Sequence, residues 1–425
     1  MKIKIKASKF IIKLFFIISL FFLVFINWHT GNFKIEDILF FVNILFLFFI
    51  VGKTQFSILS LWAIISNYVL INVYYVYKTG HGYGLLGMTK HIYMLEFDIS
   101  ILILNISLII WGFITEFLKR EKESIECSIQ IKKGTCEILA LMGVISTYIA
   151  FPRFGFGFST NRFEALLPGH FWNHLMVVLM IFATIRLKDS RIVKGCLIVI
   201  TIWLLAHGER VDIIGLYAYL FLRTCVKKGY HVNFKFIMRF FLLFVIVFSI
   251  LIYIGSAREG NLSLKKFSDI LSSLFSQSTA SDVGFVYNST IDYTKKYGLL
   301  DGKTFIVYLQ GFIPLLDQPM RAGAIIGKIY SSAGGEFILT EPFINFGFVG
   351  IAVLMNLYIF VIYQLIKRQK TYAVIVFYFL IAASFRYLWY GPTYIETGII
   401  YLIPFVWICT NSLKDRMTIR RSQSV

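Results

Sequence analysis

Arginine is the residue type whose positions carry the most chemical information in this sequence. Its planar guanidinium group presents paired N–H donors that match the oxygens of a phosphate. Five arginines lie in segments between long apolar runs, at Arg153, Arg162, Arg210, Arg258 and Arg321. Such a set predicts a binding site for an anionic ligand. We expect Arg258 and Arg210 to be catalytic residues, and Arg153, Arg162 and Arg321 to bind substrate.

Two of these arginines, and one further arginine, also have a structural interpretation. Arg210 lies in a tight turn where it can pair with Glu209 or Asp212. Arg258 follows an apolar run, so its side chain can reach from a helix end to the membrane interface. Arg386, in an aromatic segment near the end of another apolar run, is interpreted as an anchor in the aromatic belt of a membrane protein.

Candidate carboxylates lie in the segment Gly334–Gly350, which reads GGEFILTEPFINFGFVG. A carboxylate beside arginines is suited to act as a general base. Glu336 precedes the expected start of a helix, and we predict that it is the base. Glu341 and Asn345 are candidates for substrate binding. A structural alternative for Glu341 is that an acidic residue next to Pro342 favours a helix N-terminus.

The sequence does not indicate a metal or a cofactor. His170 and His174 are spaced one helical turn apart, but no third ligand accompanies them, so His170 is a candidate for substrate binding instead. The Asp-x-Asp, Gly-x-x-x-x-Gly-Lys-Ser/Thr and Gly-x-Ser-x-Gly motifs are missing. Nucleotide-driven chemistry and the use of a metal-bound sugar nucleotide are therefore not expected.

The elements that must position these residues are membrane helices. Hydrophobic residues make up 58% of the 425 residues and charged residues only 15%, against roughly 25% charged in soluble domains. A helix crosses the hydrocarbon core in about 20 apolar residues. Runs of suitable length predict an all-α polytopic membrane protein with about twelve transmembrane helices: Phe10–Trp28, Ile38–Val51, Phe56–Tyr77, Leu95–Phe117, Cys136–Phe151, Phe171–Ile185, Ile192–Ala206, Val211–Cys225, Phe240–Ser256, Phe343–Ile366, Tyr372–Tyr390 and Tyr394–Thr410.

The distribution of basic residues orients these helices. With the N-terminus inside, 26 Lys and Arg residues fall in inside segments and 6 in the short outside loops. Cytoplasmic loops are enriched in Lys and Arg. We therefore predict that both termini are cytoplasmic. The net charge of +19 is explained largely by this bias, so nucleic-acid binding is not needed to account for it.

One outer segment is much longer than the others. Residues 257–342 separate the ninth and tenth predicted helices, within what is otherwise a single membrane domain, 1–425. Apolar residues recur at helical spacing over 264–275, which predicts an amphipathic helix lying on the bilayer or packed over the bundle. Thr304–Leu316 is apolar but too short to span, and predicts a re-entrant or interfacial segment.

These features together resemble the bacterial oligosaccharide repeat-unit polymerases of the Wzy type. The resemblance rests on many aromatic-rich helices with one long outer loop before the last three, and on the turn Gly208-Glu-Arg210. It rests most specifically on Gly335-Glu336 followed by Phe343-Ile-Asn-Phe-Gly347-Phe-Val-Gly350. The Arg-x10-Gly pattern of some family members is absent from the outer arginines, which leaves their individual roles open.

The resemblance implies a fold like that of GT-C enzymes and O-antigen ligases, and a location in the bacterial inner membrane. It implies glycosyl transfer without a metal between oligosaccharides carried on undecaprenyl diphosphate, building O-antigen or capsule at the outer leaflet. The implied partners are this lipid-linked oligosaccharide, membrane lipids, a chain-length regulator and a flippase. Two alternatives stay open: a flippase or transporter of the same lipid-linked sugars, and an O-antigen ligase. No internal repeat or midplane charge typical of transporters was identified in the sequence.

Overall fold

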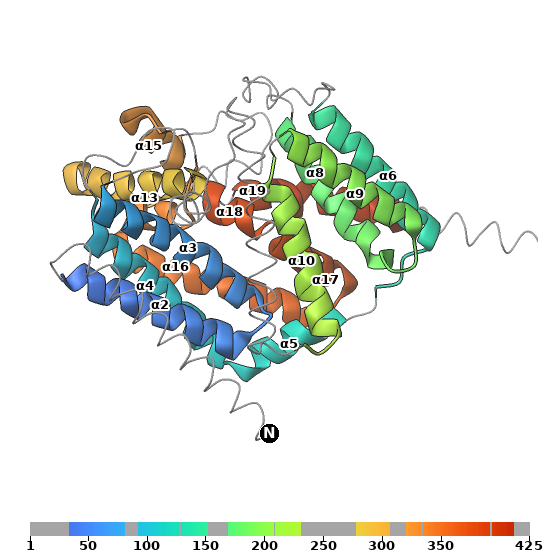
Figure 1. Cartoon of the computed structure of the whole chain (residues 1–425), viewed down its shortest axis with the longest axis horizontal. Coiled ribbons are helices and arrows are strands. Elements are labelled where there is room, and N and C mark those ends of the chain that lie inside the picture. Colours follow the sequence, from blue (N-terminus) through green and yellow to red (C-terminus); the bar gives the residue numbers. More distant parts are fainter. Residues whose placement is uncertain are drawn as a thin grey trace, which may run out of the picture.

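The computed structural model describes residues 34–80, 92–126, 129–151, 169–207, 209–230, 278–306, 320–332, 335–391 and 393–411. Within these ranges the chain is helical, with no strand longer than an isolated bridge. Figure 1 shows two groups of helices, with α18 (Ser384–Tyr390) between them. The all-α expectation is therefore confirmed for the described part of the chain.

The first group is formed by α2 (Ile35–Thr54), α3 (Ile58–Thr79) and α4 (Met94–Phe113), joined by α13 (Ser278–Tyr297) and α16 (Thr340–Arg368). Apolar residues lie on the outward faces of these helices as well as on the faces buried in the bundle. α3 is the most enclosed, with 72% of its most apolar stretch buried, so it forms the centre of this group.

The second group contains α6 (Lys133–Ala150), α8 (Gly169–Ala183) and α9 (Arg191–Ala206). α10 (Val211–Lys227) and α17 (Thr371–Ala382) pack against each other and close the space toward the first group.

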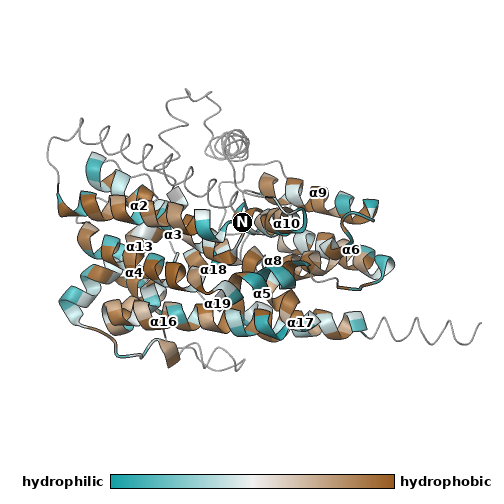
Figure 2. Cartoon of the chain, turned by 90° about the horizontal axis from the view of Figure 1, so that it is seen from below, coloured by the Kyte–Doolittle hydropathy of each residue, from teal (hydrophilic) through white to brown (hydrophobic). Residues whose placement is uncertain are grey.

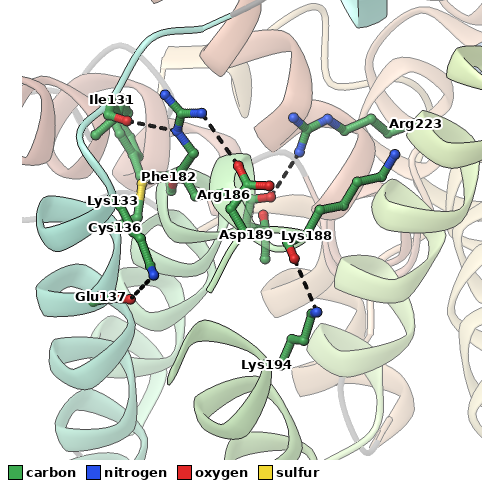
Figure 3. A network of polar contacts seen from close by, with 11 residues as sticks. Ile131, Lys133, Cys136, Glu137, Phe182, Arg186, Lys188, Asp189, Lys194 and Arg223 are labelled. Carbon is green, nitrogen blue, oxygen red and sulfur yellow. Dashed lines mark hydrogen bonds and ion pairs between the residues drawn. The ribbon is translucent and has the colours of Figure 1, made fainter. Parts of the chain in front are cut away.

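Polar contacts tie the ends of the second group together, as Figure 3 shows. Arg186, at the end of α8, donates from Nε to the carbonyl of Ile131 (3.0 Å), just before α6. Arg223 of α10 donates to the carbonyl of Thr184 (3.1 Å). These basic residues therefore hold three helix ends in place at the face predicted to be cytoplasmic.

The molecule has the surface of a membrane protein. Five described helices (α2, α3, α4, α6 and α16) are long and apolar enough to span a bilayer, or six spans if α17 and α18 form one broken span. Large apolar side chains such as Ile145, Ile202 and Val349 are exposed on these helices and on α9. Figure 2 shows the apolar colouring along the helices, with hydrophilic residues gathered on α5 (Thr115–Glu126).

Most of each predicted span that falls on described residues is helical. Phe10–Trp28 and Phe240–Ser256 lie outside the described residues, so the number twelve and the orientation stay predictions. The range Leu95–Phe117 is divided, because α4 ends at Phe113 and α5 begins at Thr115. α5 is amphipathic and charged, with Lys119–Glu123 and Lys122–Glu126 pairs one turn apart.

The long segment 257–342 contains helices that its low hydropathy did not predict. α13 buries Val283, Tyr287 and Ile291 against the bundle, and Val286 packs with Ala322 and Ile326 of the short helix α15 (Ala322–Tyr330). The predicted amphipathic helix at 264–275 and most of Thr304–Leu316 lie outside the described residues. This segment is therefore in part a packed layer of the fold.

Candidate functional site

Glu336, the predicted general base, is fixed by backbone hydrogen bonds to the last turn of α18. Its N–H donates to the carbonyl of Trp389 (2.9 Å), and the N–H of Ile338 donates to the carbonyl of Leu388 (2.9 Å). A short parallel bridge pairs Glu336 with Tyr390. Glu336 is buried, at 6% exposure. The residue is therefore held by two rigid backbone segments rather than by a free loop.

The carboxyl group of Glu336 lies against two glycines. A Cβ atom at Gly323, in α15, would stand 2.7 Å from Oε2 of Glu336, and one at Gly391 would stand 3.0 Å from its Cδ. Gly391 also has a φ of 86°, which other residues rarely adopt. The chain thus brings backbone, without side chains, to both sides of this carboxyl group. Glycine at such positions is typical of close approach between a backbone and another group.

Glu341 is engaged inside the protein. Its carboxylate accepts hydrogen bonds from the N–H of Ala322 (2.9 Å), at the start of α15, and from the hydroxyl of Thr304. Asn345 donates to the hydroxyl of Thr304 and to the carbonyl of Glu341 (2.8 Å). Glu341 lies in the first turn of α16, as its structural alternative expected, but its carboxylate caps the N-terminus of another helix, α15. Glu341 and Asn345 position the segment that carries Arg321.

The glycines of the Asn-Phe-Gly-x-x-Gly run create a break in α16. Gly347 has φ 61° and ψ −146°, a conformation outside the helical region. A Cβ atom at Gly350 would stand 2.1 Å from the carbonyl oxygen of Pro342. The first turns of α16 are therefore a separate short helix, turned away from the long apolar part, and this short helix carries Glu341 and Asn345.

A buried ion triad lies on the other side of α18. Arg386 donates to Asp212 from Nε (3.0 Å) and from an Nη atom (2.9 Å), and to Glu209 from the same Nη atom (2.6 Å). All three residues are buried. The interpretation of Arg386 as a belt anchor is wrong, because its charge points into the protein. The acidic residues that sequence reasoning offered to Arg210 are paired with Arg386.

Helix α18 connects the triad to Glu336. The Arg386 guanidinium lies 5.3 Å from the centre of the Tyr390 ring, and Tyr390 is the residue that bridges to Glu336. Arg321 immediately precedes α15 and attracts Glu396 of α19 (Thr393–Glu396) electrostatically. The site thus contains several acidic groups and two arginines around the end of one seven-residue helix.

A second polar cluster holds the layer formed by α13 and α15 against α4. Asp292 accepts from the hydroxyls of Tyr93 (2.6 Å) and Tyr330 (2.8 Å) and from Lys296 (2.5 Å). Burial raises the pKa of Asp292, but these three donors outweigh it and hold the pKa below its ordinary value. The hydrogen bond to Asp292 in turn raises the pKa of Tyr93 to about 12.

The predicted site residues are therefore only partly brought together. Glu336 lies beside Gly323 of α15, two residues after Arg321, and Glu341 contacts the same helix. Arg210 precedes α10 and is half-buried, beside the triad in sequence. The predictions for Arg153, Arg162 and Arg258 fall outside the described residues, as does the side chain of His170.

Sequence reasoning missed the triad as a unit. The signal was an arginine inside an apolar run, which is costly unless it is paired.

No family model, curated protein or solved structure matches this chain.

Proposed function

We propose that this protein polymerises lipid-linked oligosaccharide repeat units into a surface polysaccharide by glycosyl transfer without a metal. The observation that carries the proposal is the carboxyl group of Glu336, buried between Gly323 and Gly391 at the end of α18. A general base must be held rigidly, and removing water from its surroundings strengthens each electrostatic interaction there. The backbone bonds from Glu336 and Ile338 to α18 supply that rigidity.

In the proposed reaction, a sugar hydroxyl of the incoming lipid-linked unit attacks the anomeric carbon of the growing chain. Glu336 accepts the hydroxyl proton as the new C–O bond forms. The bond between the anomeric carbon and the lipid diphosphate breaks, and the diphosphate leaves with the electron pair. Positively charged groups near the leaving oxygens stabilise this developing charge. Arg210, Arg258 and Arg321 are the residues proposed for that role.

The outer surface of the protein suits a lipid-linked donor. Apolar helix faces bearing Ile145, Ile202 and Val349 face outward, as they would toward lipid, and a polyprenyl chain is compatible with the same environment. Helices long and apolar enough to span a bilayer support a substrate that stays in the membrane. Transfer between two lipid-linked sugars therefore fits this chain better than the use of a soluble sugar nucleotide.

The test is Glu336→Gln in cells that depend on this protein for their surface glycan. Loss of a general base lowers the rate by about 10²- to 10⁴-fold, so single repeat units should replace the ladder of long chains. Glu123→Gln is the matched control, because Glu123 pairs with Lys119 and Arg120 of α5 and its loss should leave the ladder intact. The amount of each variant in the membrane is measured by immunoblot.

A normal ladder from Glu336→Gln would remove the base assignment. Deletion of the protein tests the reaction class, since a polymerase deletion leaves single repeat units attached at the surface. Loss of even that single unit would contradict polymerisation.

A further inference from the structure

Asp98 is an acidic residue inside the membrane-embedded part of the protein, remote in sequence from the site around Glu336. It lies one turn inside the candidate spanning helix α4, and its exposure is 0%. An ionisable group in such a position is costly and rarely retained without a role. No sequence motif singled it out, since one Asp near the start of an apolar run resembles an interface residue.

Three asparagines form a buried chain that ends at Asp98. Asn67 of α3 donates to the carbonyl of Ala63 (2.8 Å) and to Oδ1 of Asn105 (3.0 Å). Asn105 of α4 donates to Oδ1 of Asn67 (3.3 Å) and to Oδ1 of Asn43 (3.1 Å). Asn43 of α2 donates to the backbone carbonyl of Asp98 (3.0 Å) and to its Oδ1 (3.3 Å).

The orientation of each side-chain amide in this hydrogen-bonded chain of asparagines is fixed by the groups at its two ends. A backbone carbonyl only accepts hydrogen bonds. Ala63 therefore orients Asn67, which orients Asn105, and Asn43 must turn its NH2 group toward Asp98. The amide that approaches the carboxyl group of Asp98 thus presents N–H donors, and its oxygen is occupied by Asn105.

The second carboxyl oxygen of Asp98 is different. Oδ2 is buried and has no hydrogen-bond partner among the residues that the structure describes. A buried carboxylate with one oxygen unpaired carries a large penalty for removal from water. The same group as a neutral acid carries a much smaller penalty.

The charged groups around Asp98 also oppose a negative charge there. On α2, Glu36 and Asp37 are close enough for their charges to repel it. On α3, the Lys78 ammonium lies 2.5 Å from Asp37 and the hydroxyl of Tyr74 donates to the same Asp37 (2.6 Å). The positive charge of Lys78 is therefore engaged with Asp37.

The other neighbouring elements bring no free positive charge to Asp98 among the described residues. On α13, Tyr287 donates to Ser100 (2.6 Å), while Lys295 pairs with Glu96. The acid at the start of α16, Glu341, is engaged with the start of α15. Nothing in these contacts supplies a counter-ion for an ionised Asp98.

We propose that Asp98 is a proton-binding site within the membrane, with the proton on Oδ2 and the carboxyl group held as the neutral acid. When a hydronium ion delivers the proton, one of its O–H bonds breaks as the O–H bond at Oδ2 forms, and a water molecule is released. A sodium ion fits less well, because hard cations need several oxygen ligands and the nearest amide presents N–H groups. The site is independent of the proposed glycosyl transfer.

Infrared spectroscopy of the full-length protein in liposomes at neutral pH tests this proposal. A protonated carboxylic acid has a carbonyl-stretch band that a carboxylate lacks. We expect this band in the wild-type protein, a weaker band in Asp98→Asn because the contribution of Asp98 is lost, and a band of wild-type intensity in Asp292→Asn. Asp292 is the matched control because it is a partly buried aspartate on α13 that pairs with Lys296, and its loss leaves the Lys78–Asp37 pair intact.

Asp98→Glu keeps the test usable if Asp98→Asn does not fold. With ¹³C-labelled aspartate, the band should shift in the wild type and should not shift in Asp98→Glu, where the acid is an unlabelled glutamate. An unchanged band in Asp98→Asn, or an unshifted band in the labelled wild type, would overturn the proposal. Loss of the band when Na⁺ replaces K⁺ at constant pH would overturn it in favour of a sodium site.

Discussion

The buried triad around Arg386 makes a strong prediction about stability. Arg386→Met removes the positive charge, keeps much of the side-chain bulk and leaves Glu209 and Asp212 facing each other. The three side chains have exposures of only 7%, 7% and 2%, so water cannot solvate the remaining carboxylates. We expect a large loss of stability.

The magnitude follows from the number of partners that are lost. Removing one member of a buried pair costs about 3–5 kcal/mol. Arg386 has two acidic partners and makes three hydrogen bonds to them. The loss should therefore lie near the upper end of that range, which is about 4,000-fold in the unfolding equilibrium constant. Arg386→Lys keeps the charge but not the two-point contact, and should lose less.

The assay is equilibrium unfolding of the purified protein in mixed micelles, followed by tryptophan fluorescence. The matched control is Arg120→Met in α5, whose pairs with Glu116 and Glu123 are about one-third or more exposed. Exposed pairs contribute about 0–1 kcal/mol. Adding Glu209→Gln and Asp212→Asn to Arg386→Met should recover at least half of the loss, since it removes the uncompensated charges.

A loss from Arg386→Met no larger than that from Arg120→Met would refute the reasoning. So would a triple variant that is less stable than Arg386→Met, because the penalty would then not arise from unpaired acids.

Two further predictions concern a single backbone position and a single buried acid. Gly347→Ala should destabilise the protein by about 1–3 kcal/mol, because φ 61° with ψ −146° strains any residue with a side chain. The control is Gly195→Ala, on the open face of α9, which should stabilise the protein by up to about 1 kcal/mol. Equal melting temperatures for the two variants would contradict this reasoning. Burial raises the pKa of Glu121 in α5 from 4.5 to about 7, so the folded chain binds this proton more tightly than the unfolded chain. Its contribution to stability is greatest below about pH 4.5 and falls as the pH rises to about 7, on the order of 3 kcal/mol in all. Glu121→Gln should reduce the decrease in the free energy of unfolding between those pH values, as measured by denaturant unfolding. If the free energy of unfolding changes with pH as steeply in the variant as in the wild type, another group is responsible.

The sequence predicts the helices well and their packing poorly. Long apolar runs place α2, α3, α4, α6 and α16 because a bilayer demands such runs. α13 was not predicted because its apolar residues, among them Tyr287 and Ile291, are interspersed with Ser, Thr and Asp. The helix as a whole is therefore too polar to stand out as an apolar run. Only its contacts with the bundle show that one face is buried.

The candidate site was predictable at Glu336 and not at Arg386. Glycines beside a carboxylate are a local signal, visible in the run from Gly334 to Gly350. The partners of Arg386 lie 174 and 177 residues away in the chain, and no local pattern links them. Likewise, Asp98 meets Asn43 across 55 residues, through the packing of α2 against α4.

The bend between α17 and α18 has a consequence for the bilayer itself. α17 has 12 residues before the chain turns by 59°, and at 1.5 Å per residue it rises only about 18 Å, well short of the ~30 Å hydrocarbon core. The last apolar helix, Thr397–Asn411, is also shorter than a full crossing. Two short neighbours require the lipid around them to thin, or the protein to shield the backbone where they end.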